Sequence, residues 1–398
     1  MFNQPSITPL SETGVTFVKA GTQDIDKTMA LCIASDNFDV CADDLASNPD
    51  LSNDVIGETD TKVVTPHHHV TKKHEGKEQT ECIVDESGKM DVMVANAANE
   101  KPVNSHNDIR NAVDDFLAHC NFSFPVTQYD RDFHNSCCDV ARSKGYPVDS
   151  PTLKPFIPGG VLMATTTYSH LQNKSTQILI ALYSAFLIYI DDVYQHDVEG
   201  VNCFIERFIL CQAQDDPVLD ALTSLLREFH QHFGRVASNI MITSTLNFMT
   251  SLLLDHETQG MPVSPKALDY PYFSRVMSGT SETFSLFAFP PEIPMKFYIQ
   301  AFPEVMNFLN KTNDVLSFYK EELAGETINH ISNMARCRGV SKIEVLRLLC
   351  DEVATCHLQS LNILSPHHEA HAVYSKFSQG YIDFHTSLTR YRLDELFS

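Results

Sequence analysis

The stretch NDVLSFYKE, residues 313–321, carries the strongest signal in the sequence. In a helix, Asn313, Ser317 and Glu321 are spaced four residues apart and therefore share one face. That face presents an amide oxygen, a hydroxyl and a carboxylate, which are hard oxygen ligands of the kind that Mg²⁺ prefers. Lys320 lies in the same turn as Glu321, and a lysine beside a hard cation is suited to holding a phosphate. The stretch predicts a helix that supplies one half of a metal–diphosphate site.

A second acidic motif follows the apolar run at residues 178–190. This run, which includes a serine and two tyrosines, is too short and too polar for a membrane span and predicts a buried core helix. Asp191 and Asp192 stand at its C-terminal end, where the helix dipole disfavours negative charge. A bound cation would relieve that conflict, so we expect Asp191 to be a direct metal ligand with Asp192 beside it. Asp197 is off the faces of both and joins the site only if the helix ends or bends there.

Each motif also has a plainer interpretation. An aspartate pair at a helix end is most often solvated surface or an N-cap, and an Asn/Ser/Glu triplet can be an ordinary polar face. The two motifs together, in this order and about a domain's width apart in sequence, are far more specific. We therefore favour metal binding.

Four segments of the chain resemble class I terpene cyclases and, within them, the fungal trichodiene synthase family. They are the helix ending in Asp191-Asp192, the stretch at 313–321, the segment DYPYFSRVMSG at 269–279 and the segment RYRL at 390–393. The resemblance covers residues 105–398, about three-quarters of the chain. It implies an all-α fold, a class I terpenoid synthase helical bundle around a central active-site cavity.

The resemblance also implies a set of functional residues. Mg²⁺ is the expected cofactor, with three ions held through Asp191, Asp192, Asn313, Ser317 and Glu321. The catalytic groups expected at the diphosphate are Asp191, Arg275, Lys320, Arg390 and Tyr391. The last two belong to a short terminal segment that is expected to order over the site and exclude water. The plainer alternatives are a surface salt bridge for Arg275 and a structural anchor for the terminal pair.

The implied substrate is farnesyl diphosphate, and the implied product is a cyclic sesquiterpene. A trichodiene- or cuprenene-like skeleton, formed through a bisabolyl-type cation with release of diphosphate, would suit the family. Such a cation needs aromatic faces, whose cation–π attraction contributes about 0.5–2 kcal/mol per contact. The chain has no tryptophan, and the aromatic residues nearest the motifs are Phe186, Tyr189, Phe248 and Phe318. For each of them, core packing is the plainer interpretation.

Composition narrows the function classes. The net charge of −22 argues against nucleic-acid partners, whose phosphates would be repelled. The 11 cysteines have no paired spacing, and residues 1–10 lack the basic and apolar regions of a secretory signal. Free thiols in a reducing cytosol are the simplest account, so we expect a cytoplasmic protein without a membrane span.

Two regions differ in pattern along the chain. Residues 1–104 hold 18 acidic and 8 basic side chains without sustained periodicity, which predicts an acidic, mostly disordered N-terminal extension. The cyclase domain is expected at 105–398. Helical periodicity begins near Asp108 and continues through the apolar stretches at 178–190, 218–233, 240–254, 298–318 and 343–361.

Two other functions compete with the cyclase. A chain-elongating prenyltransferase would show a second aspartate-rich motif where this chain has Asn313, Ser317 and Glu321, so it ranks low. In the family resembled, a third carboxylate often stands where this chain has Gln195, and Asp197 is displaced from that position. This departure leaves open a non-catalytic isoprenoid-diphosphate-binding protein that kept the fold. The oligomeric state is also open, with a homodimer as one alternative.

Overall fold

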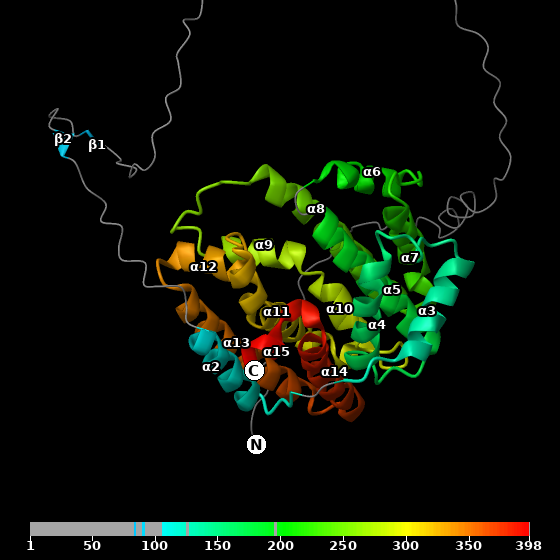
Figure 1. The fold of residues 1–398 in the computed structure, drawn as a ribbon. Coiled ribbons are helices and arrows are strands. Elements are labelled where there is room, and N and C mark those ends of the chain that lie inside the picture. Colours follow the sequence, from blue (N-terminus) through cyan, green and yellow to red (C-terminus); the bar gives the residue numbers. More distant parts are fainter. Residues whose placement is uncertain (1–82, 85–89, 92–105, 125–126, 195–196, 398) are drawn as a thin grey trace, which may run out of the picture. The chain divides into compact units, whose positions relative to one another are not determined.

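The computed structural model describes residues 83–84, 90–91, 106–124, 127–194 and 197–397 (Figure 1). The predicted acidic extension at 1–104 therefore lies outside the described residues, apart from a short antiparallel pair of strands. In this pair β1, Ile83–Val84, lies beside β2, Met90–Asp91, with Ile83 opposite Asp91. The predicted disorder of the extension stays a prediction.

All other regular elements among the described residues are helices, so the all-α prediction is confirmed. The α-helices are α2 His106–His119, α3 Arg131–Ser143, α4 Ile157–Thr166, α5 Lys174–Tyr194, α6 Phe204–Ile209, α7 Pro217–His232, α8 Arg235–Glu257, α9 Tyr270–Ser278, α10 Ser281–Phe287, α11 Phe302–Ala324, α12 His330–Arg338, α13 Lys342–Leu364, α14 His368–Ser387 and α15 Leu393–Phe397. Short 3₁₀ turns connect them at η1 Lys154–Phe156, η2 Glu199–Val201, η3 Met295–Phe297, η4 Ile299–Ala301 and η5 Thr389–Tyr391.

The apolar stretches found in the sequence correspond to α5, α7, α8, α11 and α13. The largest difference is at 298–318, where the 3₁₀ turn Ile299–Ala301 comes first and α11 begins at Phe302, with Pro303 in its first turn. Proline is well suited to that position because its missing N–H has no partner there in any case. The C-terminal end of α11 is set by Gly325, whose φ of 71° is a left-handed conformation that favours glycine.

Helix α5 packs against α3, α4 and α7, beside which it lies in Figure 1. A Cβ atom on Gly160 of α4 would lie 2.0 Å from the Ala181 carbonyl oxygen and 2.9 Å from the Ala185 Cβ of α5. The two backbones can approach this closely only because Gly160 has no side chain. This close packing fixes the position of α5 and of the acidic residues at its end.

The observed length of α5 corrects the sequence argument against a membrane span. The helix has 21 residues and is long and apolar enough to cross a membrane by length and composition. Most of it is buried against neighbouring helices, with Ile180, Tyr183 and Phe186 fully covered. It is therefore a core helix of the bundle in this structure.

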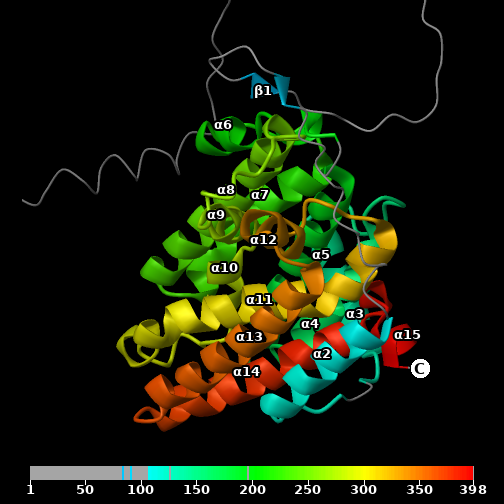
Figure 2. The same cartoon turned by 90° about the vertical axis from the view of Figure 1, so that its left-hand side faces the viewer.

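Helix α11, which carries the second predicted motif, packs against α10 and α13. Figure 2 shows α11 above α13, with α14 and α2 along the lower side of the bundle. A capping box fixes the start of α13, where Ser341 accepts from the backbone N–H of Glu344 and the Glu344 carboxylate accepts in return. The cysteines agree with the sequence prediction, because all eight within the described residues are free thiols.

Candidate active site

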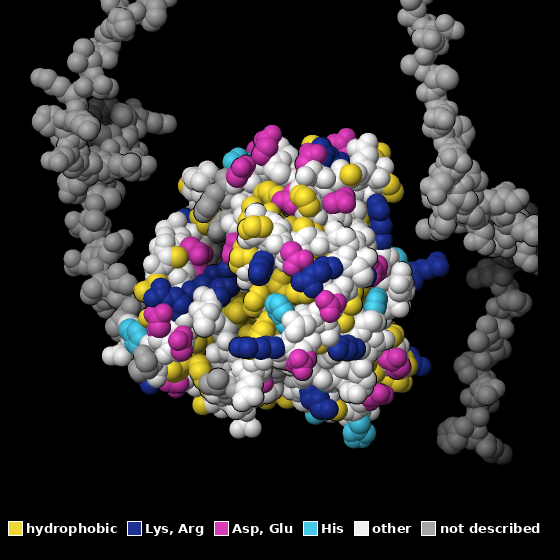
Figure 3. All heavy atoms as spheres, turned by 45° about the vertical axis from the view of Figure 1, so that its right-hand side comes forward, with side chains coloured by type: hydrophobic (Ala, Val, Ile, Leu, Met, Phe, Trp, Pro, Cys, Tyr) yellow, Lys and Arg dark blue, Asp and Glu magenta, His cyan; other side chains and the backbone are white. Residues whose placement is uncertain are grey.

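Three neighbouring cavities, all lined in part by Asp191, lie among α5, α9, α11 and the C-terminal segment. Their volumes are about 230, 310 and 580 Å³. The first is mostly apolar, whereas the third is lined by charged groups that include Asp192, Lys320, Glu321 and Arg390. In Figure 3, hydrophobic side chains gather in a hollow on one face of the bundle, with basic and acidic groups around them. An apolar cavity beside a charged one fits a ligand with a hydrocarbon part and an anionic part.

The end of α5 is held in place by two tyrosines. Tyr189 and Tyr194 both donate hydrogen bonds to Asp216 Oδ2, at 2.7 and 2.5 Å. Asp216 is also the N-cap of α7 and accepts from the backbone N–H of Val218. These bonds fix the last turn of α5, which carries the two adjacent aspartates.

The two aspartates have different surroundings. Asp192 accepts two hydrogen bonds from Arg390, from Nη1 to Oδ2 at 2.6 Å and from Nη2 to Oδ1 at 2.5 Å. Asp191 lies 3.5 Å from the same guanidinium, and 57% of its side-chain surface remains open. Because protein surrounds the cavities into which Asp191 opens, burial raises the pKa of its carboxyl, while Arg390 partly opposes this shift. A cation would stabilise the ionised form of Asp191, which fits its prediction as a direct ligand.

The predicted polar face of α11 is present. Asn313, Ser317 and Glu321 line the same charged cavity as Asp191. Ser317 Oγ is buried without a hydrogen bond of normal geometry among the described residues. Burial raises the pKa of Glu321 to about 7, although the nearby Ser317 hydroxyl and Lys320 ammonium lower it in part. Lys320 Nζ lies 4.0 Å from Glu321 Oε1.

Hydrogen bonds fix the orientation of the Asn313 amide. His385 Nδ1 lies 2.8 Å from the carbonyl oxygen of Tyr381, which can only accept, so Nδ1 carries the proton and Nε2 is an acceptor. Burial lowers the pKa of His385 to about 4, which keeps the ring neutral. Asn313 Nδ2 donates to His385 Nε2 at 3.3 Å, and Oδ1 accepts from Arg275 Nη2 at 3.1 Å. The second lone pair of Oδ1 remains for a metal ion.

The donor set fits Mg²⁺ only if neutral oxygens take part. Within the described ranges, no three His, Cys, Asp or Glu side chains converge as a metal site. Asn313 and Ser317 supply the further oxygens, and the buried Ser317 hydroxyl, which makes no hydrogen bond of normal geometry among the described residues, is a polar atom that a metal ion would satisfy. These residues therefore fit a hard divalent cation, and their assignment as ligands stays a prediction.

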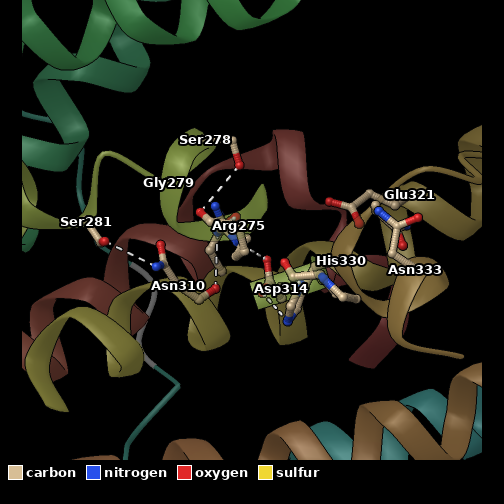
Figure 4. A network of polar contacts seen from close by, with 12 residues as sticks. Arg275, Ser278, Gly279, Ser281, Asn310, Asp314, Glu321, His330 and Asn333 are labelled. Carbon is tan, nitrogen blue, oxygen red and sulfur yellow. Dashed lines mark hydrogen bonds and ion pairs between the residues drawn. The ribbon is translucent and has the colours of Figure 1, made fainter. Parts of the chain in front are cut away.

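Arg275 lies in the last turn of α9, just before a break between α9 and α10. Gly279 and Thr280 form the break, and Thr280 has a left-handed φ of 45°, a strained conformation that tends to occur at functional sites. A Cβ atom on Gly279 would lie 2.2 Å from Asn310 Oδ1 and 2.9 Å from the Arg275 carbonyl oxygen, so the position requires glycine. Figure 4 shows Arg275 between this break and α11.

The family is settled by comparison with known proteins. Residues 148–398 match the family model described as Trichodiene synthase (TRI5). The chain belongs to the trichodiene synthase family. Alpha-cuprenene synthase COP6 of Coprinopsis cinerea is 41% identical over 293 residues, which cover 73% of this chain and 90% of the relative. Membership implies lyase activity on a prenyl diphosphate.

Other relatives of this terpene synthase differ in their named activities. Monoterpene synthase 25 of Postia placenta is 32% identical over 263 residues, covering 65% of this chain and 77% of the relative. The trichodiene synthase of Trichoderma arundinaceum is 22% identical over 236 residues, covering 56% of this chain and 59% of the relative. Among solved structures, a linalool/nerolidol synthase from Streptomyces clavuligerus matches with a TM-score of 0.51 at 13% identity, covering 66% of this chain and 99% of that one. This likeness confirms the class I fold.

The aromatic wall of the synthase differs from the one expected. Of the four predicted aromatic residues, Phe248 alone lines the apolar cavity. Phe186 packs edge-on against Tyr146, Tyr189 anchors the end of α5, and Phe318 is buried. The cavity also contains three aromatic residues that sequence reasoning missed, namely Phe284, Tyr381 and Phe384, together with Tyr391, which was expected at the diphosphate. Phe284 follows the α9–α10 break by one turn, which is the signal that could have indicated it.

Acidic groups near the site also depart from expectation. Asp197 lies beyond the end of α5, accepts from the backbone N–H of Glu199 and does not line any of the three cavities. Asp255 and Glu326, which sequence reasoning missed, line the second cavity with Asp191. Burial and the neighbouring Asp191 raise the pKa of Asp255. The cavities thus hold more carboxylates than the two motifs supply.

Proposed function

We propose that this chain is a Mg²⁺-dependent sesquiterpene cyclase that converts farnesyl diphosphate into a cyclic sesquiterpene and diphosphate. The observation that carries the proposal is the shared position of Asp191, Asn313, Ser317 and Glu321 on one charged cavity that adjoins an apolar, aromatic one. The relative at 41% identity, named an alpha-cuprenene synthase, supports this substrate class and a cuprenene- or trichodiene-like skeleton.

The cation would be held between α5 and α11. Asp191 offers the ionisable oxygen on one side, and Asn313, Ser317 and Glu321 offer three oxygens on the other. When bound, Mg²⁺ supplies Lewis-acid neutralisation of the leaving diphosphate. A cation held there would also offset the charges of the Glu321 and Asp191 carboxylates, whose pKa values are raised by the surrounding protein.

The basic groups of the charged cavity would bind the diphosphate oxygens. Lys320 and Arg390 line this cavity, and Arg275 lines the two adjoining ones. Burial lowers the pKa of Arg390, but its hydrogen bonds to Asp192 outweigh that effect and raise it, so the guanidinium stays charged. Burial raises the pKa of Tyr391, which keeps its phenol protonated as a hydrogen-bond donor. Together these groups reverse the sign of an otherwise acidic protein locally.

The C-terminal segment would close the site. Its Arg390 spans from η5 to the end of α5, and the Tyr391 ring is buried against Phe384 and His385. In this docked position the segment would cover the charged cavity and exclude water from a reactive cation. Leu187, Ile188 and Phe248 form the apolar wall that surrounds the hydrocarbon chain.

A six-membered first ring requires a change of geometry in the substrate. The trans 2,3-double bond of farnesyl diphosphate prevents direct closure, so isomerisation to nerolidyl diphosphate would precede the bisabolyl-type cation. Phe248, Phe284 and Phe384 line the apolar cavity, and their aromatic rings would stabilise positive charge along this route.

Incubation of the purified protein with farnesyl diphosphate, with and without Mg²⁺, tests the proposal. Gas chromatography–mass spectrometry of the extract should show a cyclic hydrocarbon of sesquiterpene mass only when Mg²⁺ is present. Geranyl diphosphate in a parallel arm tests the monoterpene activity named for one relative. Diphosphate binding without any product from either substrate would favour the non-catalytic binding protein instead.

A further inference from the structure

Helix α11 carries a second polar stripe beside its predicted metal face. Asn310 and Asp314 are four residues apart and share a face that is offset by one position from Asn313 and Ser317. Both side chains are buried, with 5% and 7% of their surface exposed. Buried polar side chains cost free energy unless they are paired, so their partners show what the stripe does.

Asp314 pairs with Arg275. Arg275 Nε donates to Asp314 Oδ1 at 2.7 Å, and both side chains are largely buried. Arg275 Nη2 donates to the Asn310 carbonyl oxygen at 3.2 Å and to Asn313 Oδ1 at 3.1 Å. Nη1 makes no hydrogen bond within the described part of the chain. The guanidinium is thus fixed along one edge while the residue lines two cavities, as Figure 4 shows for its contact with Asp314.

The second oxygen of Asp314 is not satisfied. Asp314 Oδ2 is buried without a hydrogen-bond partner among the described residues and lies 4.0 Å from His330 Nε2. His330 Nδ1 lies 3.1 Å from the Pro271 carbonyl oxygen and therefore carries the ring proton, which leaves a lone pair on Nε2. Burial lowers the pKa of His330, so the ring stays neutral. Two acceptors face each other, which is unfavourable for stability.

Asn310 holds the adjoining break. Its Nδ2 donates to Ser281 Oγ at 3.1 Å, and its Oδ1 occupies the space that a side chain at Gly279 would need. Figure 4 shows this contact on the side of Arg275 away from Asp314. The two residues of the stripe therefore fix the position of Arg275 and of the α9–α10 break that follows it.

We propose that Asp314 is a positioning residue, which fixes the Arg275 guanidinium so that its unpaired Nη1 is available to a diphosphate. The inference rests on the proposed role of Arg275 in binding the diphosphate. An unsatisfied carboxylate oxygen in the protein interior lowers the stability of the fold, so a stabilising role does not account for Asp314. A role in positioning Arg275 explains why the residue is present despite this loss of stability.

The Asp314→Asn variant separates positioning from stability. The asparagine keeps an acceptor for Arg275 but loses the charge, so the guanidinium is held less firmly. Its new N–H₂ group can donate to the His330 lone pair, so thermal stability should hold or rise. Binding of inorganic diphosphate with Mg²⁺, measured by isothermal titration calorimetry, should weaken by about 10-fold to 100-fold.

A double-mutant cycle shows whether Asp314 acts through Arg275. If it does, Asp314→Asn should add less than about twofold to the effect of Arg275→Lys on diphosphate affinity. The matched control is Glu352→Gln, which removes another partly buried ion pair of α11, between Lys311 and Glu352, at 2.9 Å. This control should leave diphosphate affinity unchanged. The Asp314→Glu variant, which retains the charge, provides a second test if Asp314→Asn does not fold, and it should bind diphosphate better than Asp314→Ala.

The outcomes separate this inference from the proposed function. Removal of a nearby negative charge alone would favour an anion, so tighter diphosphate binding by Asp314→Asn would overturn the positioning role. Full additivity with Arg275→Lys would overturn it as well, as would a loss of thermal stability without any change in affinity. Failure of the unaltered protein to bind diphosphate with Mg²⁺ would instead count against the proposed function.

Discussion

The acidic end of α5 and the polar face of α11 line the same cavity, yet they are held in different ways. On α11, Asn313 is fixed by Arg275 and His385, and the carboxylate of Glu321 is mostly buried. On α5, Asp191 is more than half exposed, and Asp192 is held by Arg390 from a segment 198 residues away. One half of the site is thus built into the bundle, whereas the other half depends on the C-terminal segment.

This difference has a consequence for binding. Groups that are already fixed lose little freedom when a ligand arrives, so the α11 half is preorganised. The α5 half gains its order from Arg390, a donor that would also contact the diphosphate. We expect substitutions on α11 to act on metal binding directly and substitutions around Asp192 to act through closure.

The largest effect is expected for Asn313→Ala. The change removes a proposed metal oxygen and one acceptor of Arg275. Diphosphate release from farnesyl diphosphate should fall by about 100-fold to 1,000-fold, the range typical of removing one preorganised electrostatic contact. A steady-state assay of diphosphate release measures this fall. An unaltered rate would show that the Asn313 face of α11 does not bind the metal.

Substitution of Asp191 should lower the rate of diphosphate release more than substitution of Asp192. Asp191→Asn removes a proposed direct ligand and should lower diphosphate release by about 100-fold, whereas Asp192→Asn should lower it by about 10-fold, because groups that orient ligands typically contribute less. Mg²⁺ titrations of both variants provide the measurement. Equal losses, or a larger loss for Asp192→Asn, would reverse the assignment.

Arg390→Lys tests the closure of the α5 half. Lysine keeps the charge but cannot make the paired hydrogen bonds to both oxygens of Asp192. We expect about a 10-fold rise in KM, because bonds between charged groups contribute more than neutral ones. More hydroxylated product should also appear by mass spectrometry as water enters. Wild-type kinetics with an unchanged product ratio would show that the segment does not close the site.

The smallest effect on rate is expected in the apolar cavity. Phe284→Leu keeps a hydrophobic wall but removes one aromatic face worth about 0.5–2 kcal/mol to a nearby cation. The product ratio should shift by about 2-fold to 30-fold with little change in diphosphate release. Phe186→Leu is the matched control, because Phe186 packs in the core and should affect stability without changing the product ratio. A shifted product ratio in both variants would contradict the assignment of Phe284 to the cavity wall and of Phe186 to the core.

The same contrast explains what could be predicted from sequence. The α11 face follows from helical spacing alone, since Asn313, Ser317 and Glu321 share a face in any regular helix. The α5 half could be predicted only in part, because the helix ends at Tyr194 and Asp197 turns away to bond with Glu199. Spacing carries no information on where a helix ends without a cap signal.

Long-range contacts were the least predictable part. Phe284 of α10 follows the α9–α10 break by one turn, but no local pattern distinguishes the other wall residues, Tyr381 and Phe384 of α14, from core aromatics. The contact between Asp314 and Arg275 likewise depends on how α9 packs against α11. The resemblance to a family indicated Arg275, whereas its partner became evident from the three-dimensional arrangement.

A crystal structure with Mn²⁺ and inorganic diphosphate is the most direct test of the central claim. Mn²⁺ replaces Mg²⁺ at oxygen sites and gives an anomalous signal. The account predicts metal peaks about 2.0–2.3 Å from an oxygen of Asp191 and from the oxygens of Asn313, Ser317 and Glu321, with diphosphate between the two helices. Metal bound elsewhere, or diphosphate bound without metal on both helices, would contradict it.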